Sequence, residues 1–214
     1  MRNEALIRGA TELFRASVAP YCKLTQRGMT RRITAAAPIK IINDQRDRRI
    51  DRAGLTYQLN VIRNILGVED YALGLMITTN EEMKKINRKY RKKDEPTDIV
   101  ALPVHEDLDP RQPLPNIPPE LKDLGDIIVS LPYIESNCAS LNVPLEEEFP
   151  FILTHGILHL MGHDHEEDDE AELMEAKEEE VKELFWRQLA EEARENGGRH
   201  PSAFYQNEAD VSND

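Results

Sequence analysis

A cluster of histidines limits how residues 154–165 can fold. Four of the six histidines of this 214-residue chain fall in that segment. His155 and His159 are four residues apart, so on an α-helix they lie on one face, one turn apart. Gly162 ends the predicted helix and lets the chain fold back, which brings His165 toward the pair. The spacing therefore predicts a helix over 146–161, a tight turn and three converging imidazoles.

Three neutral imidazole nitrogens fill three positions of a tetrahedral zinc ion at about 2.0–2.1 Å and leave the fourth open, as in catalytic sites. Zinc lowers the pKa of a bound water from about 15.7 to about 7. We therefore expect one Zn²⁺ ion held by His155, His159 and His165. His163 is not expected to bind the metal, and Asp164 either orients an imidazole or caps the turn.

The same spacing is similar to that of metzincin-type zinc peptidases, H-E-x-x-H-x-x-G-x-x-H. Gly156 occupies the position at which those enzymes carry the glutamate that serves as general base. Without this carboxylate, peptide hydrolysis loses its proton acceptor. A zinc metallopeptidase is therefore kept as the alternative rather than the main interpretation.

The rest of the chain mixes helical and strand patterns. Apolar runs predict strands at 39–42, 73–78, 98–102 and 125–131. Helical spacing predicts helices at 51–66, from Thr79, from Pro132, and at 146–161 and 166–194. Six of the 13 prolines fall within residues 103–124, which predicts a loop. The expected fold class is α+β, in one domain at 39–195 with about four strands, whose parallel or antiparallel pairing stays open.

Charge is distributed unevenly along the chain. The formal net charge of −13 argues at first against nucleic acid as a partner. Most of the acidity lies at 166–195, however, whereas residues 84–93 carry seven basic side chains and no acid. Salt limits the reach of distant charge to about 10 Å, so this segment can still bind phosphate. Arg91 suits a bidentate phosphate contact, although a solvated helix face is the alternative. The helical register of Tyr90 predicts a core position rather than base stacking.

Both ends of the chain differ from the predicted domain. Residues 1–38 are rich in Arg and poor in acid, which predicts a disordered transit peptide, with an ordinary basic tail as the alternative. The pattern does not separate mitochondria from plastids, and we expect the mitochondrion first. Residues 196–214 predict a disordered polar tail. The sequence has no long uncharged apolar run, so we expect a soluble protein with no membrane partner.

Two motifs and a shorter block carry a resemblance to a known family. The string H-G-x-L-H-L-x-G-x-D-H at 155–165 resembles the signature of the YbeY family, single-strand-specific endoribonucleases that act in ribosomal RNA maturation. Residues 87–98 are similar to its N-x-x-Y-R-x-x-D-x-P-T-D segment, and residues 124–127 to a third block. The likeness covers roughly residues 39–195. One departure is Ala101, where the family usually has a serine.

The resemblance implies a zincin-like α+β fold, in which a small mixed β-sheet packs with helices beside the histidine-bearing helix. It implies a zinc-dependent endoribonuclease of ribosomal RNA processing and ribosome biogenesis, with ribosomal RNA and the small ribosomal subunit as partners. It also implies Arg91 as a residue important for activity. We expect Lys89, Arg91, Lys92 and Lys93 to bind the substrate. A non-catalytic ribosome-assembly factor with a structural metal site is the other alternative, and Asp126, Asp164 or the RNA 2′-hydroxyl remain open as the base.

Overall fold

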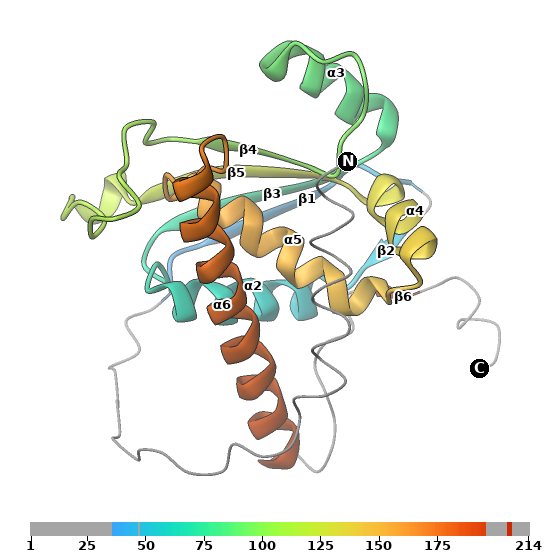
Figure 1. Ribbon diagram of the computed structural model, residues 1–214. Coiled ribbons are helices and arrows are strands. Elements are labelled where there is room, and N and C mark those ends of the chain that lie inside the picture. Colours follow the sequence, from blue (N-terminus) through green and yellow to red (C-terminus); the bar gives the residue numbers. More distant parts are fainter. Residues whose placement is uncertain (1–35, 47, 196–204, 207–214) are drawn as a thin grey trace. The chain divides into compact units, whose positions relative to one another are not determined.

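The computed structural model describes residues 36–46 and 48–195, together with the backbone of residues 205–206 (Figure 1). The strands are β1 (Ile39–Asn43), β2 (Arg49–Ile50), β3 (Ala72–Thr78), β4 (Ile99–Pro103), β5 (Asp123–Ser130) and β6 (Tyr205–Gln206). The helices are α2 (Arg52–Leu66), α3 (Asn80–Arg91), α4 (Leu131–Leu141), α5 (Leu145–Leu160) and α6 (Asp168–Glu195), with a 3₁₀ turn η1 (Pro119–Leu121). The predicted transit peptide lies outside the described residues except for 36–38, and so does the predicted tail except for β6.

A four-stranded mixed sheet forms the centre of the domain, with strand order β1-β3-β5-β4. β1, β3 and β5 are parallel, and β4 runs antiparallel to β5 at the edge. The short strands β2 and β6 form a separate antiparallel pair. The predicted α+β class and the small mixed sheet are confirmed.

The helix boundaries follow from local capping chemistry. Asp51 accepts a hydrogen bond from the Ala53 amide at 2.9 Å and begins α2, which ends at Gly67 in the left-handed region, with φ 72°. Thr79 Oγ1 accepts from the Glu82 amide at 3.4 Å and begins α3. The helices predicted at 51–66 and from Thr79 agree with α2 and α3 to within one residue at these ends.

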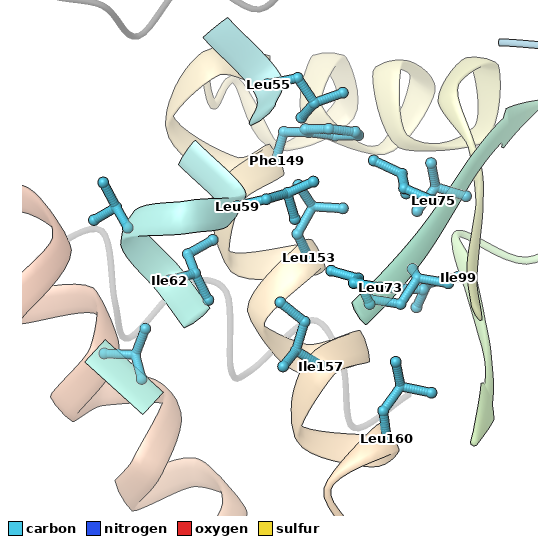
Figure 2. Packing of buried hydrophobic residues seen from close by; sticks show 14 of the residues in the cluster. Leu55, Leu59, Ile62, Leu73, Leu75, Ile99, Phe149, Leu153, Ile157 and Leu160 are labelled. Atoms are coloured by element: carbon cyan, nitrogen blue, oxygen red, sulfur yellow. The ribbon is translucent and has the colours of Figure 1, made fainter. Parts of the chain in front are cut away.

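The main core lies between one face of the sheet and helices α2 and α5. Figure 2 shows Leu59 of α2 and Leu153 of α5 packed together, with Leu75 of β3 beside them. Val181 and Phe185 of α6 are also buried in this cluster. Burying one such side chain stabilises the fold by about 1.5–3 kcal/mol. This packing fixes α5, the helix that carries two of the histidines, against the sheet.

Helix α3 packs on the opposite face of the sheet. Met83 contacts Val100 and Ile128, whose neighbours along β4 and β5 face the main core instead. Toward its C-terminal end α3 rises away from the strands (Figure 1), and Tyr90 is 49% exposed. The predicted core position of Tyr90 is wrong because the last turn of α3 has no layer to pack against.

In the part of the chain that the structure describes, no helix combines the length and apolar character needed to cross a membrane.

Candidate metal centre

The end of α5 positions the histidines. His155 and His159 lie one turn apart on this helix, which ends at Leu160. Gly162 adopts φ 91°, and the His163 amide donates to the Leu158 carbonyl at 3.0 Å, which closes the turn. A Cβ atom at Gly162 would lie 2.3 Å from a backbone oxygen of the loop after β4, so only glycine fits there.

The three imidazoles converge. The ring centroids of His155 and His159 are 4.6 Å apart, and the ring of His165 lies 5.4 Å and 5.1 Å from them. One nitrogen from each ring lies within 4.8 Å of the other two. A tetrahedral ion at about 2.0–2.1 Å from each nitrogen separates its ligands by about 3.4 Å. These three residues can therefore form a metal site.

Hydrogen bonds at the far side of two rings set their tautomers. His155 Nδ1 lies 2.7 Å from Glu178 Oε1, and His159 Nδ1 lies 2.9 Å from the backbone oxygen of His163. Both partners are acceptors, so each Nδ1 carries the proton and each Nε2 presents a lone pair. The two Nε2 atoms face each other at 3.1 Å. Two lone pairs at that distance cannot bond to each other, and a cation between them satisfies both.

Burial keeps one ligand candidate neutral. Desolvation, followed by the neighbouring His155, lowers the pKa of His159 from 6.5 to about 4. A neutral imidazole is the form that binds metal. Burial also lowers the pKa of His163, whose ring does not belong to the converging trio.

The sequence did not indicate Glu178. It lies on α6, 23 residues after His155, among many similar acids of that helix. The prediction for Asp164 left two roles open, and the structure shows the capping role, since Asp164 Oδ1 accepts from the His165 amide at 2.8 Å. Asp126 is exposed on β5 and lies beside Gly74. The Asp126 side chain points to the face of the sheet away from α5, which does not support it as the base.

The predicted phosphate-binding residues lie at the end of α3 and just after it. Their basic neighbours Lys84 and Arg88 lie 3.4 Å and 3.5 Å from the Asp94 carboxylate. Arg91 and Lys93 are exposed and form no ion pair with any described residue. The structure thus brings the three histidines together, whereas α3, with Arg91 at its end, packs on the other face of the sheet.

Comparison with known proteins gives one consistent result. The family described as Endoribonuclease YbeY matches residues 40–185. A relative of that name from Fusobacterium nucleatum is 39% identical over 132 residues, which cover 59% of this chain and 78% of the relative. One from Homo sapiens is 36% identical over 142 residues, covering 66% and 84%. The solution structure of TM1509 from Thermotoga maritima is similar with a TM-score of 0.50 and 26% identity, covering 75% of this chain and 95% of that one.

Proposed function

The chain belongs to the endoribonuclease YbeY family, and we propose that it is a zinc-dependent endoribonuclease that cuts single-stranded RNA in ribosomal RNA processing and ribosome biogenesis. One observation carries the proposal. The Nε2 atoms of His155 and His159 face each other at 3.1 Å, while the Nδ1–H group of each ring donates to another acceptor. The family membership supplies the reaction class, a hydrolytic nuclease.

One Zn²⁺ ion is the proposed cofactor, with His155, His159 and His165 as its ligands. A bound zinc ion supplies a Lewis acid that activates water and neutralises charge on a phosphate oxygen. Glu178 and the backbone oxygen of His163 hold two of the rings in the ligating tautomer. The all-nitrogen donor set suits zinc better than the oxygen-preferring magnesium or calcium.

Phosphate binding is proposed for Lys89, Arg91, Lys92 and Lys93. Arg91 is the proposed catalytic residue through its contact with the RNA strand, since its planar guanidinium can bind two oxygens of one phosphate from the α3 side of the sheet. Its exposure supports this role, because a side chain already bound to a carboxylate would first have to release it.

The surroundings of Gly156 oppose the peptidase alternative. A Cβ atom at this position would lie 2.6 Å from Ile99 Cδ1 and 3.1 Å from Ile127 Cδ1. The helix packs closely on the sheet there, so a glutamate would have to displace the side chains of Ile99 and Ile127 and would point into the core, away from the converging histidines. The chain therefore lacks the general base of a metzincin-type peptidase, at a position that faces the core.

Ribosomal RNA and the small ribosomal subunit are the proposed partners. The organisation proposed from the sequence is an import segment at 1–38, a hydrolase domain at 39–195 and a polar tail at 196–214. A mitochondrial destination is proposed ahead of a plastid one. Fusion of residues 1–38 to a fluorescent protein tests the destination, and a diffuse cytosolic signal would contradict it.

Metal analysis coupled to RNA cleavage tests the function. We expect one zinc ion per full-length chain and cleavage of a single-stranded RNA but not of a duplex. A chelator should stop cleavage and added zinc should restore it, while a protein substrate stays intact throughout. A metal-loaded chain that binds the small subunit but cuts no RNA would instead support the non-catalytic assembly factor.

A further inference from the structure

Strand β4 is the outer strand of the sheet and lies between the candidate metal centre and α3. Its partner among the described strands is β5, so its other edge is free. On one face of the sheet, Gly156 beside His155 packs against Ile99 of β4. On the other face, Met83 of α3 packs with Val100 of the same strand. Figure 1 shows β4 at the edge of the sheet, with α3 on one side and α5 on the other, so an RNA strand that reaches both regions passes over this edge.

The register with β5 decides which main-chain groups lie at the free edge. In an antiparallel pair, alternate residues bond to the partner strand, and the residues between them point their N–H and C=O groups away. The Ser130 amide donates to the Asp98 carbonyl at 2.8 Å, and the Val104 amide donates to the Leu124 carbonyl at 3.1 Å. The even-numbered residues of 98–104 therefore bond to β5, whereas the odd-numbered ones present their main-chain groups to the free edge.

Hydrogen-bond acceptors outnumber donors at this edge. The Ile99 amide already donates to Asp98 Oδ1 at 2.8 Å, and Ile99 is itself buried. Pro103 has no N–H group. Ala101 and Pro103 are partly exposed, and their outward main-chain groups have no hydrogen-bond partner among the described residues. The accessible edge therefore offers two carbonyl oxygens but one N–H group, with the Asp98 carboxylate at its start.

These groups suit a hydroxyl donor better than a phosphate or a second β-strand. Carbonyl oxygens and a carboxylate only accept hydrogen bonds, so they do not bind phosphate oxygens, which are acceptors too. A strand that pairs with β4 would use a row of donors and acceptors, and both Asp98 and Pro103 take a donor out of that row. Single-stranded RNA carries a hydroxyl donor, the 2′-OH, on every nucleotide whatever its base.

We propose that the free edge of β4 binds the ribose backbone of the RNA strand near the cut. The carbonyl oxygens of Ala101 and Pro103 accept from 2′-hydroxyl groups, and the Ala101 amide donates to the same backbone. The inference rests on the proposed function and deepens it, because it gives the physical reason why the chain would cut RNA rather than DNA. The 2′-OH is the group by which a protein distinguishes the two at a given site.

The first test changes the substrate and uses the zinc-loaded full chain. A short single-stranded RNA is made with one 2′-deoxy or one 2′-fluoro nucleotide at each position in turn. Both changes remove the donor, and fluorine keeps the sugar pucker of RNA. At one or more positions other than the nucleotide at the cut, we expect either change to lower kcat/KM about fivefold, as for one lost hydrogen bond. A change of base at those positions should have no comparable effect.

The second test changes the edge itself. Proline is tolerated on an edge strand where the N–H group points away from the partner strand, so Ala101→Pro should keep the bonds to β5. It removes the free amide and places a ring carbon at the edge. Cleavage of the all-RNA strand should fall about fivefold, and the 2′-substituted strands should then be cut as fast as the all-RNA strand. Val104→Ala, at an exposed side chain just after β4, is the matched control and should behave like the wild type. Zinc content and thermal unfolding check that both variants are folded.

Several results would overturn the proposal. One is cleavage that is indifferent to 2′-substitution at every position away from the cut, and another is an effect of base identity in place of the sugar. A full dependence on the 2′-OH in a zinc-loaded Ala101→Pro variant would place its recognition elsewhere. A wild type that dimerises through β4, and loses the dimer in Ala101→Pro with cleavage unchanged, would assign the edge to a second copy of the chain. If Ala101→Pro does not fold, the substrate series still decides, since it needs no variant.

Failure of the nuclease assignment would look different. The affinity of the same strands is measured by fluorescence anisotropy on the zinc-loaded chain. A chain that cut no RNA, but bound the all-RNA strand more tightly than the 2′-substituted strands and lost this difference in Ala101→Pro, would keep the ribose-binding edge and refute the nuclease.

Discussion

The turn that carries the three histidines (residues 155–165) and the basic end of α3 (residues 89–93) carry the two halves of the proposed chemistry, and they are built differently. At the turn, two of the three imidazoles are held by a hydrogen bond to a fixed acceptor, and both rings are partly buried. At the end of α3, the cations are exposed and sit on long flexible stems. Two rings of the turn thus have fixed acceptors, whereas Arg91 and Lys93 form no ion pair with any described residue.

This difference separates the expected effects of mutation. Changes at the turn should alter metal content and the rate of cleavage, with little effect on how RNA binding depends on salt. Changes on α3 should alter RNA affinity and its salt dependence, with metal content unchanged. A variant that moves both sets of observables would show that the two regions are coupled through the sheet between them.

Removing one ligand should have the largest effect. His159→Ala takes away a partly buried nitrogen of the trio, and two histidines alone should hold zinc poorly. We expect metal content to fall from one ion per chain to nearly none, and cleavage to fall by more than the 10–100-fold typical of losing an outer partner. His105→Ala, at a histidine outside the trio, is the control. Full metal stoichiometry in His159→Ala would refute the ligand assignment.

Glu178→Ala tests how the turn is ordered. Loss of the carboxylate 2.7 Å from His155 Nδ1 frees that ring to rotate and to change tautomer. We expect a metal affinity lower by about 10–100-fold, measured by competition with a zinc chelator of known affinity. Glu179→Ala, at the exposed neighbour on the same helix, should bind zinc like the wild type. Equal affinities in the two variants would remove Glu178 from the site.

The sequence predicted the contacts that depend on spacing within one helix, and it missed those that depend on how two elements pack together. The pairing of His155 with His159 was predictable because helix geometry alone places residues four apart on one face. Glu178 was not, because its contact depends on how α6 packs across α5, and nothing in the sequence distinguishes it from other acids on α6. Tyr90 lies in the same helical register as the buried Met83, but its ring is exposed. Periodicity predicts which face of a helix is apolar, and it does not predict how much of that face the sheet covers.

Arg91→Ala should have the next largest effect. If the guanidinium binds a phosphate, its loss removes charge-assisted hydrogen bonds. At an exposed site we expect this loss to weaken RNA affinity by about tenfold. The zinc content should stay at the wild-type value. Lys85→Ala removes a cation of α3 that already pairs with Glu82 and is the matched control. RNA affinity and cleavage that stayed intact in Arg91→Ala would exclude it from the clamp.

The smallest effect is expected for a single lysine, and it is best seen as a salt slope rather than as an affinity. Each phosphate neutralised on single-stranded RNA contributes about −0.7 to the slope of log K against log salt concentration, because bound counterions are released. Lys93 is exposed and has no ion pair among the described residues, so Lys93→Gln should make the slope shallower by about 0.7. Affinity at moderate salt should fall only about two- to threefold.

Glu178→Ala serves as the opposite case in the same titration, since it should leave the slope unchanged while it lowers zinc affinity. An unchanged slope in Lys93→Gln would place the RNA away from the end of α3. The strand would then approach the histidines from the α5 face alone, and the division of roles between the turn and the basic helix would no longer hold.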